Sequence, residues 1–121
     1  MGQEEGSMRK YTYKMFENKC KEIAKSILKN KEIKYIMGIH RGGLIPAVRI
    51  SHLTGLPMIQ FDDVVPHTNI AIIDDCIDSG RTRDKWKEYN SYYVLINKQK
   101  EKVNDWVIFW WEEKDGTWSK K

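Results

Sequence analysis

Residues 69–82 combine two kinds of polar group that few ligands would satisfy together. The segment reads NIAIIDDCIDSGRT, in which an apolar stretch leads to the adjacent acids Asp74 and Asp75 and then to a Ser-Gly-Arg-Thr run. Gly80 lets backbone N–H groups approach an anion, and the serine and threonine hydroxyls beside it can donate hydrogen bonds. Ionised carboxylates only accept hydrogen bonds, and a sugar diol offers two donors. A ribose phosphate satisfies both halves of the segment.

A second polar loop, GIHRGGLIPA at residues 38–47, also follows an apolar run. Two glycines before a helix are common, and Arg41 could simply face solvent, so this loop alone is weaker support for an anion site. Its interpretation depends on where the fold places it relative to residues 69–82.

The hydrophobic pattern predicts the helices that position these loops. Apolar side chains recur every three or four residues from residue 13 to residue 28, the period of an amphipathic helix, at Phe16, Cys20, Ile23, Ala24, Ile27 and Leu28. Thr12 can cap this helix, and Asn30 can end it. A second helix is expected from Pro46 to Gly55, and a third from Gly80 to about Tyr89.

Short apolar runs predict strands at residues 35–39, 58–61, 69–73, 92–96 and 106–110. Residues 74–79 are expected to form a loop after the third of these strands, and residues 62–68 a turn. Strands that alternate with helices are typical of a parallel sheet covered on both faces. Ligands of such sheets bind at the carboxyl ends of the strands. If the strands at residues 35–39 and 69–73 are neighbours, the two polar loops face one cleft.

The composition indicates one globular domain. Hydrophobic residues make up 40% and charged residues 31% of the 121 residues, which favours neither disorder nor a membrane protein. No apolar run is long enough to span a membrane, and no secretory signal is visible, so we expect a cytoplasmic protein. Residues 1–7 resemble an artificial leader, which leaves residues 8–121 as the domain. Cys20 and Cys76 have no metal-ligand spacing and are expected to be small core residues.

Residues 69–82 resemble the 5-phosphoribosyl 1-pyrophosphate (PRPP) motif of type I phosphoribosyltransferases: an apolar strand, paired acids, then Thr or Ser, Gly, any residue and Thr. The resemblance implies that Asp74 and Asp75 hold the ribose hydroxyls of PRPP, and that Asp75 also lies near Mg²⁺. Asp78 would face the base nitrogen and take its proton. The residues that would hold the 5′-phosphate are Ser79, Gly80, Arg81 and Thr82. The structural alternative is an ordinary strand-to-helix turn with solvated acids and a hydroxyl cap.

The loop at residues 38–47 is similar to the pyrophosphate loop of the same family. The resemblance implies that backbone N–H groups and the arginine hold the pyrophosphate, with the residues His40, Arg41, Gly42 and Gly43. The peptide before this arginine is often cis in the family, so the bond between His40 and Arg41 provides a structural check.

The C-terminal segment WVIFWWEEKDG is similar to the purine wall of bacterial xanthine-guanine phosphoribosyltransferases. The resemblance implies that Trp106 stacks on the base, that Val107 offers it backbone contacts, and that Trp111-Glu112 is the terminal aromatic-acid pair. Lys98 matches the lysine that reaches the purine 6-oxo group. On periodicity alone, the segment is an edge strand with an aromatic cluster, and Lys98 is one of several surface lysines.

The resemblance implies both a fold and a reaction. The fold is α/β, with an open, mainly parallel twisted sheet of about five strands flanked by helices, a minimal hood and a shortened mobile loop. In the reaction, a nitrogen of a free oxo-purine base (guanine, xanthine or hypoxanthine) attacks C1 of the ribose, and magnesium pyrophosphate leaves. Residues 62–68 depart from the family, because they are too short to fold over the substrate. We therefore expect slow transfer unless a homodimer partner covers the site.

Two other functions fit parts of the sequence. A non-catalytic module that senses PRPP or a nucleotide would need no lid, and the absence of product from PRPP and a base would identify it. The net charge of +4, the pI of about 9.0 and the five tryptophans suggest a nucleic-acid binder. However, the basic residues form no stripe interleaved with aromatic residues. A steep salt dependence of single-strand binding would support that function.

Overall fold

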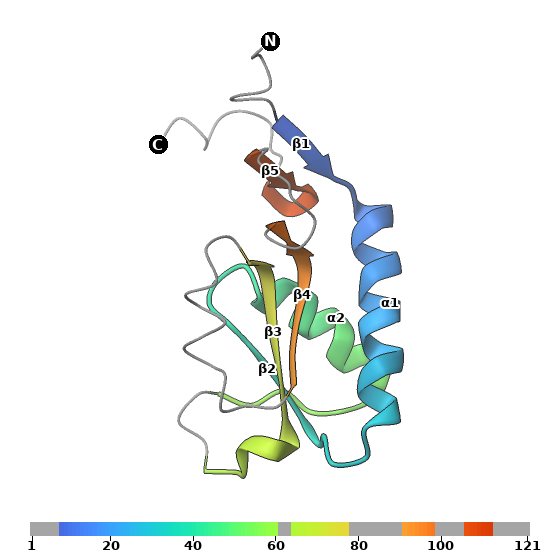
Figure 1. The fold of residues 1–121 in the computed structure, drawn as a ribbon, viewed down its shortest axis with the longest axis vertical. Helices are drawn as coiled ribbons and strands as arrows, with labels where there is room; N and C mark the ends of the chain where they lie inside the picture. The colour runs from blue at the N-terminus through green and yellow to red at the C-terminus, as the bar shows by residue number, and fades with distance from the viewer. Residues whose placement is uncertain (1–7, 61–63, 78–90, 99–105, 113–121) are drawn as a thin grey trace.

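A three-stranded parallel sheet forms the centre of the computed structural model, which describes residues 8–60, 64–77, 91–98 and 106–112. Its strands are β2 (Tyr35–Gly38), β3 (Ile70–Ile77) and β4 (Ser91–Asn97), in the order β2-β3-β4. Both pairings are parallel, so the carboxyl ends of the three strands meet at one end of the sheet (Figure 1). The sequence-based expectation of a mainly parallel α/β fold is confirmed.

Helix α1 (Tyr13–Lys29) begins and ends close to the predicted residues. The hydroxyl of Thr12 accepts a hydrogen bond from the backbone N–H of Met15 at 3.2 Å, which caps the first turn. At the other end, the backbone N–H of Asn30 donates to the carbonyl of Ile27. The buried residues of α1 are Phe16, Cys20, Ile23, Ala24 and Ile27. Leu28, which the period also included, is exposed.

Helix α2 (Leu44–Thr54) begins earlier than the predicted start at Pro46. The backbone N–H of Ala47 donates to the carbonyl of Gly43 at 3.1 Å, so the proline lies in the first turn, where the missing N–H breaks no helical hydrogen bond. The predicted end is confirmed, because Gly55 has a φ of 79°, in the left-handed region that favours glycine.

Both helices pack on the same face of the sheet and contribute to one core cluster with Ile36, Ile73 and Leu95 (Figure 1). Between the helices, the Arg49 guanidinium donates from two nitrogens to the two carboxylate oxygens of Glu17, at 2.8 and 2.5 Å. Because side chains alternate along a strand, the other face of the sheet carries a second cluster, which contains Met37, Ile70 and Ile72.

A second parallel sheet, with two strands, was not expected from the sequence. β1 (Met8–Tyr11) pairs with β5 (Trp106–Phe109), and Tyr11 lies opposite Phe109. Figure 1 shows this small sheet beyond the carboxyl ends of β3 and β4. The described strands therefore divide between two sheets rather than forming one, and the sequence MRKY has no apolar run that would have predicted β1.

Aromatic rings attach the small sheet to α1. After β5, the chain forms the short 3-10 helix η3 (Trp110–Glu112), and Glu112 Oε1 accepts a hydrogen bond from the backbone N–H of Phe109 at 3.0 Å. Trp111 stacks on Phe109, with ring centroids 4.6 Å apart, and Trp110 meets Phe16 of α1 edge-on at 5.4 Å. Such contacts add to the burial of the rings, so they hold the small sheet against the helix.

The predicted strand at residues 58–61 is wrong for the part that the structure describes. Met58 makes only an isolated parallel bridge with Ile36. The N–H of Ile36 donates to the carbonyl of Pro57, and the N–H of Ile59 donates to the carbonyl of Ile36, both at 2.9 Å. Further along, the 3-10 helix η2 (His67–Asn69) occupies part of the predicted turn and precedes β3.

Neither helix in the described part of the chain has both the length and the apolar character that crossing a membrane requires.

Candidate functional site

The two adjacent acids lie within β3 and not in the loop predicted for residues 74–79. The strand continues to Ile77 because β4 runs beside it, with Asp74 opposite Val94 and Ile77 opposite Asn97. Residues on a paired strand are held by the backbone hydrogen bonds of the sheet, so the positions of these acids are more restricted than those of loop residues. The loop prediction is therefore wrong for residues 74–77, and residues 78–82 lie outside the described residues.

Asp74 is buried, with 6% of its surface exposed, and both of its carboxylate oxygens accept hydrogen bonds. The hydroxyl of Tyr92 donates to Oδ2 at 2.8 Å, and the backbone N–H of Asp75 donates to Oδ1 at 2.8 Å. A buried carboxylate is costly without such partners, so these two donors allow the acid to lie at the end of the sheet.

The glycine loop after β2 packs directly against the second acid. β2 and β3 are neighbours, which is the condition under which the two polar loops face one cleft, and the N–H of Ile39 continues their pairing by donating to the carbonyl of Ile73 at 2.9 Å. A side chain at Gly42 would overlap the Asp75 carboxylate, since an added Cβ would lie 2.6 Å from Cγ of Asp75. The structure therefore brings together the two polar segments singled out in the sequence.

One further feature of the glycine loop matches an expectation, and a second feature was not predicted. The peptide bond between His40 and Arg41 is cis. Gly43 lies against backbone, because a Cβ there would meet the carbonyl oxygens of Ile73 and Ile39. Only glycine fits such a close approach of two chain segments.

The surroundings of Asp75 favour its protonated form. Burial is the main cause, and the hydrogen bond with Asp74 and the charge of Asp74 add to it, so that the pKa of Asp75 rises from its ordinary value of 3.8 to about 7. A cation placed beside the pair would reverse the effect of the neighbouring charge. Asp74 and Asp75 together therefore favour the binding of either a proton or a cation.

This pKa predicts how the stability of the unliganded protein depends on pH. Between the unfolded pKa of 3.8 and the folded pKa of about 7, the folded state holds a proton that the unfolded state has released, so stability falls as pH rises through this window. Asp75→Asn removes the titration, and its free energy of unfolding should exceed that of the wild type above pH 7. Solvent screens the half-buried side chain, so we expect a gain on the order of 1 kcal/mol.

Urea unfolding at pH 5, 6, 7 and 8 measures this gain, which should shrink toward the acidic end of the series. Glu32→Gln, at an exposed acid before β2, is the matched control and should unfold like the wild type. A gain for Asp75→Asn that stays constant across the series would contradict the prediction.

The residues expected to contact a base lie in two separate elements. Lys98 follows β4 directly, so it leaves the sheet at the same end as the acidic pair. Val107 belongs to β5, where its side chain is part of the core cluster and its backbone lies opposite Arg9 of β1. The backbone of Trp106 is in the same strand. Asp78, Ser79, Gly80, Arg81 and Thr82 lie outside the described residues.

The described residues contain no group of three or more His, Cys, Asp or Glu side chains that could enclose a metal ion. Mg²⁺ does not require such a group, because it keeps several waters and commonly takes one or two carboxylates together with substrate phosphate oxygens. The oxygen donors of Asp74 and Asp75 fit this pattern.

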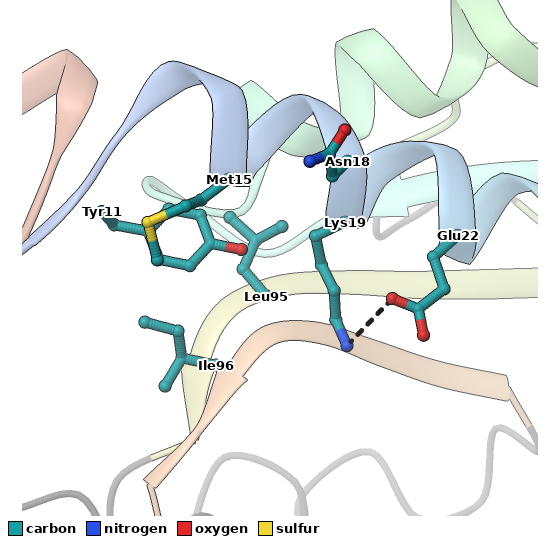
Figure 2. A pocket seen from close by; sticks show the side chains of 7 residues that line it. All are labelled: Tyr11, Met15, Asn18, Lys19, Glu22, Leu95 and Ile96. Carbon is teal, nitrogen blue, oxygen red and sulfur yellow. Dashed lines mark ion pairs between the residues drawn. The ribbon is translucent and has the colours of Figure 1, made fainter.

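A hollow of about 350 Å³ lies elsewhere, between α1 and β4 (Figure 2). Lys19 and Glu22 form an ion pair at its rim, with Nζ and Oε1 3.6 Å apart. The lining residues are Tyr11, Met15, Asn18, Lys19, Glu22, Leu95 and Ile96. None of the predicted site residues lines this hollow, so it is distinct from the candidate site.

Several solved structures have the same fold. A purine phosphoribosyltransferase from Pyrococcus horikoshii aligns with a TM-score of 0.67 and 23% identity, over 89% of this chain and 96% of that chain. A xanthine-guanine-hypoxanthine phosphoribosyltransferase from Helicobacter pylori aligns with a TM-score of 0.73 and 16% identity, over 96% and 99% of the two chains. A hypothetical protein from Neisseria gonorrhoeae with bound ppGpp aligns with a TM-score of 0.66 and 16% identity, over 91% and 92%.

No family model matches the chain, and no curated protein matches its sequence. The relation to known proteins therefore rests on the three-dimensional alignment, which extends over almost the whole length of each of these structures. Since these identities are low, the alignment establishes the architecture and not the ligand. The chain has the fold of the type I phosphoribosyltransferases.

Proposed function

We propose that the protein is a phosphoribosyltransferase that binds PRPP and Mg²⁺, transfers the phosphoribosyl group to an oxo-purine base and releases pyrophosphate. The observation that carries this proposal is the contact between Gly42 and Asp75. Through this contact, a glycine loop and an acidic pair from neighbouring strands meet at the carboxyl end of a parallel sheet, the place where such folds bind ligands. PRPP carries its pyrophosphate on C1 of the ribose, next to the hydroxyl on C2, and the two segments offer complementary groups for the pyrophosphate and the ribose hydroxyls.

The described residues provide groups for two parts of the ligand. Asp74 and Asp75 would accept hydrogen bonds from the ribose hydroxyls, because ionised carboxylates accept and hydroxyls donate. Residues 40–43 would hold the pyrophosphate through backbone N–H groups and the charge of Arg41. Charge neutralisation of this kind favours departure of the leaving group as positive charge develops on the ribose.

Two further roles would fall to residues outside the described part of the chain. Ser79, Gly80, Arg81 and Thr82 would hold the 5′-phosphate, and Asp78 would take the proton of the attacking base nitrogen. Asp75 is the residue that would lie beside Mg²⁺, which would neutralise charge on the departing pyrophosphate.

A panel of free bases assayed with PRPP and Mg²⁺ tests the proposal directly. Nucleotide should form slowly with guanine, xanthine or hypoxanthine, and pyrophosphate should be released in measurable excess over nucleotide, because water can compete with the base at an open site. A melting curve recorded with PRPP and Mg²⁺ should lie above that of the unliganded protein, because a ligand that binds only the folded state stabilises it. The absence of both product formation and a thermal shift would overturn the proposal.

Replacement of Lys98 by Ala should weaken base binding without changing PRPP binding. A lysine donates to a 6-oxo group and opposes an exocyclic amine, so the wild type should prefer oxo-purines to adenine. Loss of one hydrogen bond with a charged donor should raise the KM for guanine about tenfold or more. The KM for PRPP is the internal control. Lys34→Ala, at an exposed lysine before β2, is the matched control variant.

Equal use of adenine and guanine by the wild type would contradict this role of Lys98. An equal rise in both KM values for Lys98→Ala would also contradict it, because the substitution would then act on the whole site.

The second candidate is a non-catalytic nucleotide-binding module. The similarity to the Neisseria gonorrhoeae protein with bound ppGpp favours it, because this fold is there seen with a pyrophosphate-bearing nucleotide. The shortened segment before β3 supports the same candidate, since a sensor does not have to exclude water from a reacting centre. A thermal shift with PRPP or ppGpp, together with no product from any base, would favour the module over the enzyme.

A further inference from the structure

We infer that Tyr92 is a positioning residue for the ribose-binding acid, which acts by holding the Asp74 carboxylate in a fixed orientation. The inference rests on the proposed function and adds to it a residue that touches neither PRPP nor the base. Tyr92 belongs to none of the motifs that the sequence offers, and it lies far from Asp74 along the chain.

The register of the sheet explains how Tyr92 reaches the acid. Tyr92 lies opposite Ile72, and Asp74 lies opposite Val94, so Tyr92 and Asp74 are diagonal neighbours on the same face of adjacent strands. Diagonal neighbours on adjacent strands are too far apart for most pairs of side chains to touch, but an aromatic side chain can span the distance. The hydroxyl of Tyr92 ends 2.8 Å from Oδ2 of Asp74.

The hydrogen bond from Tyr92 restricts the terminal side-chain torsion of Asp74, which would otherwise vary over a broad range. The terminal torsion of an aspartate has broad minima, so the side chain alone does not orient its carboxylate. Here Tyr92 holds one oxygen, and the backbone N–H of Asp75 holds the other. A carboxylate has about four lone-pair positions, and two donors leave the others available for ribose hydroxyls in a defined direction.

The next residue along β4 provides a matched comparison. Tyr93 lies opposite Ile73, so its ring is on the other face of the sheet and packs against the main core cluster. Both tyrosines are half-buried and belong to the same strand. Removal of either hydroxyl is the same chemical change at neighbouring positions, and only Tyr92 touches the acidic pair.

Steady-state kinetics of Tyr92→Phe and Tyr93→Phe test the inference. For Tyr92→Phe, we expect the KM for PRPP to rise about tenfold, with the KM for the base and kcat within about twofold of the wild type. This pattern indicates the loss of an interaction made equally in the ground state and the transition state. Tyr93→Phe should resemble the wild type in all three constants. A purely structural role of Tyr92 would instead lower the melting temperature and change the constants together.

Asp74→Glu supplies a second variant, because it keeps the charge but moves the carboxylate by one methylene away from the Tyr92 hydroxyl. We expect it also to raise the KM for PRPP about tenfold or more. If the wild type uses PRPP while Tyr92→Phe and Asp74→Glu behave as Tyr93→Phe does, the inference is overturned and the proposed function stands. If the wild type neither binds nor uses PRPP, the proposed function fails, and the inference fails with it.

Discussion

The double variant Asp74→Asn/Asp75→Asn is expected to lose the whole thermal stabilisation that PRPP and Mg²⁺ give the wild type. At a ligand concentration about a hundredfold above Kd, binding stabilises the folded state by about 2.7 kcal/mol, which raises the melting temperature of a chain of this size on the order of 10 °C. Two amides present N–H groups as well as carbonyl oxygens, and they carry no negative charge. Each amide keeps only one acceptor oxygen in place of two, and neither supplies the negative charge that attracts Mg²⁺ and strengthens hydrogen bonds from the ribose hydroxyls.

The unliganded double variant should melt cooperatively, because the amide oxygen at position 74 can still accept a hydrogen bond from the Tyr92 hydroxyl. A control variant must show whether the loss of stabilisation comes from these two acids or from the change in net charge. Glu22→Gln/Glu32→Gln changes the charge equally at two exposed positions. This control should keep the full shift. If PRPP and Mg²⁺ raise the melting temperature of the Asp74→Asn/Asp75→Asn variant as much as that of the wild type, the ribose site is not on β3.

Gly42→Ala is expected to reduce PRPP binding about a hundredfold while the protein still folds. The added methyl group would occupy the place of the Asp75 carboxylate, and that carboxylate is the end of a side chain, so it can turn away without displacing the backbone. Displacement of a binding group by about 1 Å commonly costs on the order of a hundredfold in activity. The measurements are the Kd for PRPP by calorimetry and the melting temperature without ligand.

Two neighbouring substitutions show whether the effect is specific. Gly43→Ala would meet the carbonyl oxygens of Ile73 and Ile39, which belong to the backbone, so it should lower the melting temperature as well as binding. Gly55→Ala has no atom within 4 Å of the added group but places alanine at a φ of 79°, so it should cost about 1 kcal/mol of stability and leave the Kd unchanged. If Gly42→Ala binds PRPP as tightly as Gly55→Ala, the glycine loop is not part of the site.

Local signals in the sequence were sufficient for the two helices that pack on the central sheet. The cap at Thr12 and the apolar period of α1 involve residues within a few positions of one another, and so does the left-handed turn at Gly55. The sequence left open whether β2 and β3 are neighbours. Their pairing meets the condition under which the two polar loops were expected to face one cleft, and Gly42 lies against Asp75.

Long-range pairing accounts for the errors. Asp74 and Asp75 were assigned to a loop because acids rarely occur in strands, but the neighbouring β4 extends β3 past them to Ile77. β1 was missed for the same reason, since its partner β5 lies at the far end of the chain. The hydrogen bond between Tyr92 and Asp74 became visible only with the register of the sheet, because no motif connects residues so far apart.

The pairing of β1 with β5 also constrains the order in which the chain can fold during synthesis. Met8 pairs with Trp106, so the first described strand has no partner until nearly all of the described chain has left the ribosome. Contacts between distant parts of a chain form slowly, because the loop between them must close first. Until then, Tyr11 and Phe16 lack the rings of Phe109 and Trp111 that cover them in the finished protein. The nascent chain therefore exposes an aromatic surface until β5 has been synthesised, and a chaperone would protect it from aggregation during that interval.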